Sequence, residues 1–366
     1  MKKSLSVAAG IVAFASCLPV PQARAQGSVT VYGIVDTGVE YLNHANAAGQ
    51  GKFRTLALTG LQPSRLGFRG VEDLGGGLRA FFNLETGFAA TTGALSQGNR
   101  IFGRQANLGL ADTAWGTLTL GRQYNMTALS MVSADVMGPS NHGVSNMDSY
   151  LPNTRSDNAV GYLNKFGNTA VGFTYSTGRD TSSAGGPAAT NCPGEVAGDA
   201  QACRQWTAMI KYDASRWGVA AGYDTMRGGP GAANLLTSSD YKDNRANYSG
   251  WFMLGQLKIG GGLVARHQQR AVSINSNLWY LGASYPLSVQ WQLEGQVAHL
   301  DTRNSPDDST LGTVRAIYFL SRRTSVYGSY AYIRNRGNAA VPVSSGITAA
   351  AGQNQASVMA GLRHTF

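Results

Sequence analysis

The last eleven residues of the chain alternate between two kinds of side chain. They read ASVMAGLRHTF, and Val358, Leu362 and Phe366 share one parity while Arg363 and small or polar residues hold the other. Because successive side chains of a strand point to opposite faces, this segment predicts a strand with one apolar and one polar face. A transmembrane β-barrel needs that arrangement, apolar outside and polar inside. A soluble half-buried strand alternates in the same way, so a secreted all-β sandwich is the alternative.

Repetition of the pattern favours the membrane. Between residues 289 and 297, apolar residues and glycine alternate with Gln290, Gln292, Glu294 and Gln296. We expect further outward-facing sets to be Val171, Phe173 and Tyr175; Trp251, Met253, Gly255 and Leu257; and Trp279, Leu281, Ala283 and Tyr285. Aromatic residues fall near strand ends, as girdles at two membrane interfaces require.

The first 25 residues have the features of an export signal. Lys2 and Lys3 precede an apolar stretch, and Ala23-Arg24-Ala25 forms an A-x-A site. We expect cleavage between Ala25 and Gln26, which divides the chain into a signal peptide (1–25) and a barrel domain (26–366). Lipidation at Cys17 is the alternative.

Charge and hydropathy exclude other classes of protein. The chain carries a formal charge of +10 and has a pI near 9.6, which could suggest nucleic-acid binding. The basic residues are dispersed, however, and we expect no nucleic-acid partner; in a barrel they would line the lumen. No run of 18 apolar residues follows the signal, so a membrane-spanning chain of this kind must be a closed barrel.

Short turns and long polar loops alternate along the chain. The expected turns contain residues 73–76, 112–116, 166–168, 214–216, 286–288 and 321–323, with less distinct breaks near Ile259-Gly260 and Arg270 to Asn275. These divisions predict sixteen antiparallel strands, with short turns in the periplasm and long loops outside.

Two cysteines remain after the signal. Cys192 and Cys203 lie in a stretch rich in Gly, Pro and Ala, and no C-x-x-C redox spacing is present. In an oxidising compartment we expect a disulfide that ties an external loop.

Several segments resemble the general diffusion porins of Gram-negative bacteria, especially the β-proteobacterial branch. They are VTVYGIVDTGVEY (29–41), SRLGFRGVEDLGGGL (64–78), FGRQANLGLADTAWGTLTLGRQY (102–124), LSRRT (320–324) and GLRHTF (361–366). The resemblance implies a trimeric sixteen-stranded barrel in the outer membrane, with the third loop folded into the lumen. It also implies that terminal Phe366 is the signal read by the barrel-assembly machinery.

Strand parity and this resemblance together suggest a pore constriction. In the second strand Leu66 and Phe68 point outward, so Arg65 and Arg69 point inward, and parity likewise turns Arg79 inward. By resemblance, Arg65, Arg104 and Arg155 match the wall arginines of the family, Arg122 extends the row, and Asp135 matches an acid of the third loop. We expect Arg104 to open the fourth strand and Arg155 the sixth. The alternative is that Arg65, Arg69 and Arg79 are solvated lumen residues, or that they pair with Glu72, Glu85 or Glu40.

The resemblance implies a passive channel for small hydrophilic solutes and ions. Arginine keeps its charge at any relevant pH, so an excess at a narrow site predicts a preference for small anions. A channel selective for carboxylates or phosphate is the alternative. The expected partners are two further copies of the chain, outer-membrane lipid, lipopolysaccharide and the assembly machinery.

The sequence lacks the patterns of an enzyme built on a barrel. No G-x-S-x-G, H-E-x-x-H or paired-Cys metal motif occurs, and none of the five histidines lies beside a nucleophile pattern. We therefore expect no catalytic residue, no cofactor and no metal. An outer-membrane phospholipase or protease is the rival of another class.

Overall fold

The computed structural model describes residues 27–180 and 190–366. The expected signal peptide, with its cleavage site at Ala25 and Gln26, lies outside the described residues. In the part of the chain that is described, no helix is long and apolar enough to cross a membrane.

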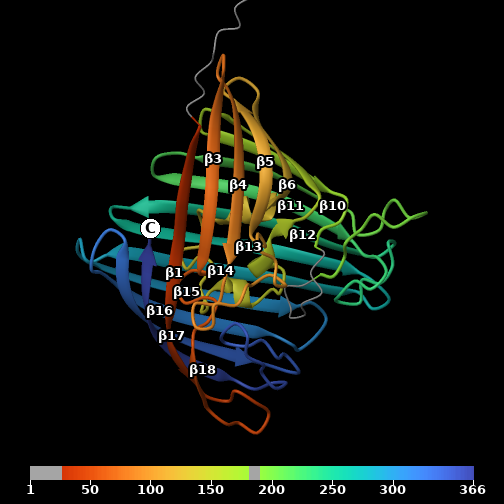
Figure 1. The fold of residues 1–366 in the computed structure, drawn as a ribbon. Helices are drawn as coiled ribbons and strands as arrows, with labels where there is room; N and C mark the ends of the chain where they lie inside the picture. The colour runs from red at the N-terminus through yellow and green to blue at the C-terminus, as the bar shows by residue number, and fades with distance from the viewer. Residues whose placement is uncertain (1–26, 181–189) are drawn as a thin grey trace, which may run out of the picture.

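The chain forms a closed antiparallel barrel (Figure 1). The sixteen strands of its wall are β1 (Ser28–Leu42), β3 (Arg65–Gly75), β4 (Leu78–Gly87), β5 (Gln105–Asp112), β6 (Gly116–Tyr124), β8 (Ala159–Phe166), β9 (Thr169–Ser176), β10 (Gln205–Asp213), β11 (Trp217–Arg227), β12 (Lys242–Leu254), β13 (Leu257–Gln269), β14 (Ile274–Pro286), β15 (Trp291–Thr302), β16 (Ser309–Phe319), β17 (Thr324–Asn335) and β18 (Gln355–Thr365). Each strand pairs with its neighbour along the chain, and β18 pairs with β1 to close the cylinder. The predicted strand number and the predicted fold class are confirmed.

Five short elements lie outside this wall. β2 (Lys52–Thr55) pairs with the end of β1, and β7 (Arg155–Ser156) pairs with the end of β6. Helix α1 (Met126–Met131) and the 3-10 turns η1 (Val144–Asn146) and η2 (Leu151–Asn153) belong to residues 125–154, called here the third loop.

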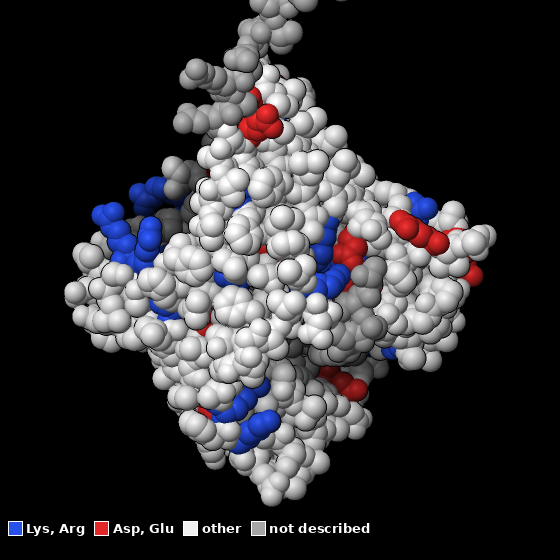
Figure 2. All heavy atoms as spheres, viewed as in Figure 1, with Lys and Arg blue, Asp and Glu red and all other residues white. Residues whose placement is uncertain are grey.

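Alternation along the strands decides which face meets the membrane. In β18, Val358 and Leu362 are 55% and 47% exposed, whereas Ser357 and Met359 are each 1% exposed. Figure 2 shows a mostly uncharged surface over β1 and β3 to β6. Such a surface satisfies the outer requirement of a transmembrane barrel, because charged side chains on the lipid face are costly.

Two details of the predicted strand pattern are wrong. The turn expected near Ile259-Gly260 lies instead between Leu254 and Leu257, so β13 runs through both residues. Trp251 and Met253 do not belong to the outer face, since Tyr248, Phe252 and Leu254 are the exposed residues of β12. The indole N–H of Trp251 donates to Asp213 at 2.9 Å on the inner side. The reason is that the apolar run 251–257 crosses a turn, which resets the parity.

The third loop lies against the inner face of the wall. Its successive residues contact successive strands: the Met126 amide donates to Thr207 of β10, Thr127 to Asp224 of β11, and Ser130 to Asn247 of β12. Farther along, Gln296 of β15 donates to Asp135, and Thr313 of β16 donates to the carbonyl of His142. The loop therefore follows the inside of the barrel around most of its circumference.

Part of the inner face is apolar, contrary to the expectation of a polar lining. Val264, Leu278, Leu311 and Ile333, on β13, β14, β16 and β17, are all at most 2% exposed. They form one cluster with Met131, Val144 and Met147 of the third loop and with Val343 of the loop between β17 and β18. Apolar contacts therefore hold two loops onto this side of the barrel.

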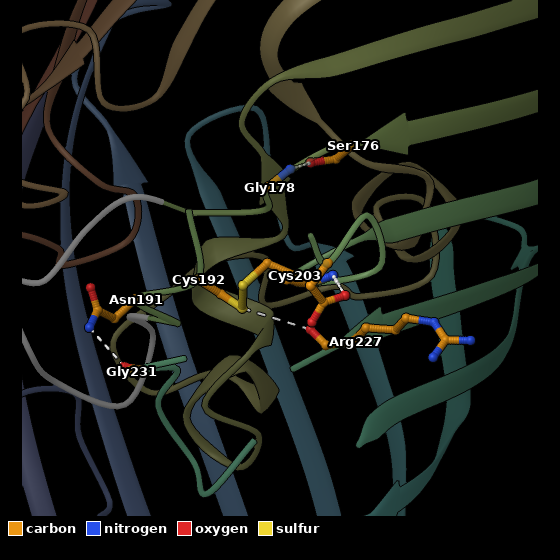
Figure 3. Close-up of a disulfide and its surroundings, with 9 residues drawn as sticks. Ser176, Gly178, Asn191, Cys192, Cys203, Arg227 and Gly231 are labelled. Atoms are coloured by element: carbon orange, nitrogen blue, oxygen red, sulfur yellow. Dashed lines mark hydrogen bonds between the residues drawn. A yellow bond between two sulfur atoms is a disulfide. The ribbon is translucent and has the colours of Figure 1, made fainter. Parts of the chain in front are cut away.

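Cys192 and Cys203 form the expected disulfide, which lies in the loop between β9 and β10 (Figure 3). Both residues are 1% exposed and pack with Met226 of β11 and with Ala232 and Leu236 of the loop that follows this strand. The Cys203 amide donates to the Gly228 carbonyl at 2.8 Å. The disulfide thus closes one external loop, which packs against the end of β11 and the loop that follows it.

Candidate functional site

Four of the seven predicted constriction residues line one cavity inside the barrel. This cavity has a volume of about 350 Å³, and Arg65, Arg104, Arg155 and Asp135 all border it. Arg65 opens β3, while Arg104 comes just before β5, and Arg155 opens the short β7. The predicted role of Arg155 as the start of the sixth wall strand is wrong, since that strand, β8, begins at Ala159.

Glu85 of β4 organises two of these arginines. Its Oε1 accepts from Nε of Arg104 at 2.7 Å, and its Oε2 lies 3.7 Å from Nε of Arg65. Antiparallel pairing explains the cluster, because Glu85 lies opposite Gly67 on β3 and Gln105 on β5. Charged groups from three neighbouring strands therefore meet at one height of the wall.

Tyr124, at the end of β6, joins two guanidinium groups. Its hydroxyl oxygen accepts from Nη2 of Arg104 at 2.7 Å and from Nη2 of Arg155 at 2.8 Å. The guanidinium carbon of Arg155 also lies 4.4 Å from the centre of the Tyr124 ring, a cation–π geometry. The three arginines with Glu85 and Tyr124 are called here the arginine cluster.

A backbone irregularity turns Tyr124 inward. Leu118 and Leu120 are exposed on the outer face of β6, yet Tyr124, of the same parity, borders the inner cavity. Between them Gly121 has a φ of +104°, which glycine tolerates because it lacks a Cβ. The alternation of β6 therefore reverses after Gly121.

Asp135 borders the cavity from the third loop without pairing to the arginine cluster. Its Oδ1 accepts from Nε2 of Gln296 at 2.8 Å and from the Met137 amide at 3.2 Å. Burial raises the pKa of Asp135, and the hydrogen bond from Gln296 acts in the opposite direction. The expected acid is therefore present at the cavity, bound to the opposite wall.

The other three predicted arginines lie outside this cavity. Arg69 and Arg79 are exposed on the parts of β3 and β4 nearer their connecting turn, and Arg69 lies 5.6 Å from the Tyr32 ring centre. Arg122 is buried, ion-paired to Asp157, and donates to the Gly103 carbonyl at 2.7 Å. The structure does not bring these three into the arginine cluster.

A second cavity, of about 360 Å³, lies beside the first and shares Arg104 with it. Its lining includes Gln97, Arg100, Asn141 and Asp180 from the long loops. Pro63, Pro139, Ser145 and Pro152 also border both cavities. Arg104 therefore stands where the space beneath the loops meets the cavity of the arginine cluster.

Polar anchors hold the third loop in place. Asp148 accepts from Nε and Nη2 of Arg245 at 2.9 and 3.0 Å, and the loop carboxylate is buried. His142 is 0% exposed; its Nε2 lies 3.1 Å from Glu40 Oε1, and its Nδ1 lies 3.0 Å from Ser329 Oγ. These contacts fix both halves of the loop that borders the cavity.

The described residues contain no group of three or more His, Cys, Asp or Glu side chains arranged to hold a metal. Strict parity from Leu118 and Leu120 places Tyr124 on the outer face, so strand alternation alone does not reveal its role. Gly121 was the only sequence signal for the reversal. Glu85, one of the alternative partners expected for these arginines, lies at the centre of the cluster.

Comparison with known proteins gives a consistent result. The family model described as "Gram-negative porin" matches residues 6–338. Outer membrane porin protein 32 of Delftia acidovorans is 30% identical over the full length of both chains. An outer membrane porin protein of Bordetella pertussis is 29% identical, covering 92% of this chain and 95% of its own. The solved anion-selective porin from Comamonas acidovorans has a TM-score of 0.77 at 25% identity, covering 93% of this chain and all of its own.

Proposed function

The chain belongs to the Gram-negative porin family, and on that premise we propose that its arginine cluster makes the channel prefer anions. The protein is a passive outer-membrane channel for small hydrophilic solutes. The observation that carries the proposal is the charge around the cavity. Arg65, Arg104 and Arg155 border it, with Glu85 as the only carboxylate, among the described residues, within 4 Å of any of the three guanidiniums.

Fixed positive charge in a narrow space acts on every passing ion. The surrounding wall has a low dielectric constant, so it concentrates the field of the cluster within the lumen. Anions are attracted and cations repelled, while passage requires that each ion also leave quickly. Arginine suits this role, because its guanidinium remains charged across the physiological pH range.

Zero-current potentials across a planar bilayer in a salt gradient test this proposal. We expect a wild-type potential of the sign that marks anion preference, and a reduced value in Arg104→Gln and Arg155→Gln. Arg79→Gln is the matched control, because it removes an inward charge outside the cavity. A wild-type channel with clear cation preference would refute the proposal.

We propose further that the channel assembles as a homotrimer. The outer surface of β1 and β3 to β6 supports this, since it presents an almost uncharged face with exposed Val29, Val31 and Leu108. Single-channel recording should show closure in three equal steps, and crosslinking in detergent should give a three-chain species. Single-step closure together with a one-chain crosslinking pattern would contradict the trimer.

The remaining proposals concern export and chemistry. Residues 1–25 are proposed to be removed before Gln26, so intact mass spectrometry of the protein from outer membranes should give a chain that begins there. Phe366 is proposed to be read by the barrel-assembly machinery. The finished barrel is proposed to contact outer-membrane lipid and lipopolysaccharide.

The family and the fold are those of channels rather than enzymes. Catalysis is proposed to be absent, and release of fatty acid from phospholipid by the pure protein would contradict this.

A further inference from the structure

Among the buried arginines, Arg155 and Arg179 have no carboxylate within 4 Å in the described part of the chain, and of these two only Arg155 borders the cavity of the arginine cluster. Arg104, Arg122, Arg245 and Arg315 are similarly buried, and each has a carboxylate partner within 4 Å. Arg155 is 3% exposed, and no described carboxylate lies that close to its guanidinium. Its charge is therefore the least compensated of these five.

The guanidinium of Arg155 is held mainly by one neutral side chain. Tyr124 accepts a hydrogen bond from its Nη2 at 2.8 Å and places its ring 4.4 Å away. The other side-chain contact is a long hydrogen bond of 3.4 Å from Nη1 to Asn153 Oδ1. The Nε atom of Arg155 is buried without a partner. Burying a charge without a counter-ion is costly, so the tyrosine contact carries unusual weight here.

The same tyrosine oxygen also holds Arg104. A phenol oxygen has two acceptor positions, and both are taken by arginine N–H groups, at 2.7 and 2.8 Å. Two like charges are thereby kept close together on one side of the cavity. Arg104 is restrained a second time by Glu85 at 2.7 Å, whereas Arg155 has no second strong restraint.

We propose that Tyr124 is a positioning residue for ion selectivity, which sets the anion preference of the channel by fixing the unpaired charge of Arg155 at the cavity wall. The inference rests on the proposed function of the arginine cluster. Without the phenol oxygen, we expect the Arg155 guanidinium to turn away from the cavity toward a nearby carboxylate such as Asp157, which directly follows β7. Removing the Tyr124 hydroxyl leaves the charge of the protein unchanged, so a change in selectivity would reflect only the position of the Arg155 guanidinium.

Tyr124→Phe is the test. This substitution keeps an aromatic ring and removes the hydroxyl oxygen that accepts the two hydrogen bonds. Tyr124→Trp has the same effect, because the indole N–H can donate a hydrogen bond but cannot accept one. We expect the anion-to-cation permeability ratio of either variant to fall about as far as that of Arg155→Gln. Adding Tyr124→Phe to Arg155→Gln should cause no further fall, because both changes remove the same effect.

Tyr162→Phe is the matched control, since it removes a phenol that donates to the Trp115 carbonyl away from the cavity. Only variants that remain folded in cold detergent are measured. Two substitutions, Tyr124→Phe and Tyr124→Trp, are used so that the test still stands if one of them fails to assemble. A wild-type ratio in folded Tyr124→Phe, together with a reduced ratio in Arg155→Gln, would overturn the inference and leave the proposed function intact. A cation-preferring wild type would instead overturn the proposed function.

Discussion

At the scale of single residues, the balance of charge at the cavity depends on Glu85. Its carboxylate lies 2.7 Å from Arg104 and 3.7 Å from Arg65, so it offsets part of the field that the three arginines create. Among the described residues, Glu85 forms ion pairs with Arg65 and Arg104 and none with Arg155. Selectivity in this channel is therefore a difference between a few opposed charges, and one substitution can shift it in either direction.

Glu85→Gln should increase the preference for anions. One charge at about 7 Å in water-like surroundings is worth about 0.6 kcal/mol, with opposite sign for anion and cation, so the permeability ratio should rise roughly sevenfold. Zero-current potentials measure this ratio. Glu72→Gln, which removes an exposed carboxylate of the same wall, should leave it near the wild-type value. A fall in the ratio for Glu85→Gln would show that the carboxylate chiefly keeps the arginines in place.

Among the structural elements, the third loop is fastened to the wall by charge and by apolar packing. Burial alone would raise the pKa of Asp148, but the ion pair with Arg245 outweighs it and holds the pKa below its usual range. A carboxyl group with a depressed native pKa binds more protons in the unfolded chain. Its stabilising contribution is therefore complete above about pH 4 and is lost as the pH falls further.

Asp148→Asn tests this anchor. Arg245 keeps Asp243 at 3.1 Å, so we expect a loss of about 3 kcal/mol at pH 7, the lower end for a broken buried pair. Thermal unfolding between pH 3 and pH 8 should show a smaller acid-induced decrease in the variant than in the wild type. Asp240→Asn, in an exposed loop, serves as the control. Equal melting temperatures of variant and wild type at pH 7 would argue against the anchor.

Apolar packing also holds the third loop against the barrel wall. Leu311 is 1% exposed on the inner face of β16 and packs beneath the loops. Leu311→Ala should cost about 2–5 kcal/mol and increase the current noise of the open channel, because the third loop loses part of its support. Val314→Ala, at a position 60% exposed on the outer face of the same strand, should cost much less. Equal losses in the two variants would show that the inner cluster gives the loop no special support.

The sequence predicts the elements well where alternation runs without interruption. The turn at 214–216, the closing strand and the inward direction of Arg65 follow from residues close in the chain. Alternation places Trp251 on the wrong face because its apolar run crosses a turn, and it misplaces Tyr124 because Gly121 reverses the pattern of β6. The apolar cluster around Leu311 could not be predicted, since the residues that cover it, Val144 among them, are far away in the chain.

For the molecule as a whole, closure of the cylinder depends on the contact between its two ends. The Gly33 amide donates to the Phe366 carbonyl at 3.1 Å, and the Phe366 amide donates back to Gly33 at 3.1 Å. The ring of Phe366 lies so close to Gly33 that an added Cβ would be 2.4 Å from its Cζ atom. The same Cβ would lie 2.7 Å from the Arg65 carbonyl oxygen, so only glycine fits here without displacing the terminal ring or the β3 backbone.

Gly33→Ala should therefore weaken the closed barrel by about 1–3 kcal/mol, as overpacking of a tight contact does. The temperature at which the folded band converts to the unfolded band on detergent gels measures the effect. Gly312→Ala is the control, because a Cβ at that wall position meets nothing within 4 Å. Unchanged conversion in Gly33→Ala would show that the terminal ring and the facing β3 backbone adjust without penalty.

The anchorage of His142 has a consequence for the order of assembly. The groups around this side chain are Glu40 from the first strand, Ser329 from β17 and Ser357 from the last strand. An unfinished sheet that lacks its final strand also lacks the Ser357 contact, so the anchor at His142 is complete only when the barrel closes. Barrel closure and the final fastening of this part of the third loop are therefore coupled.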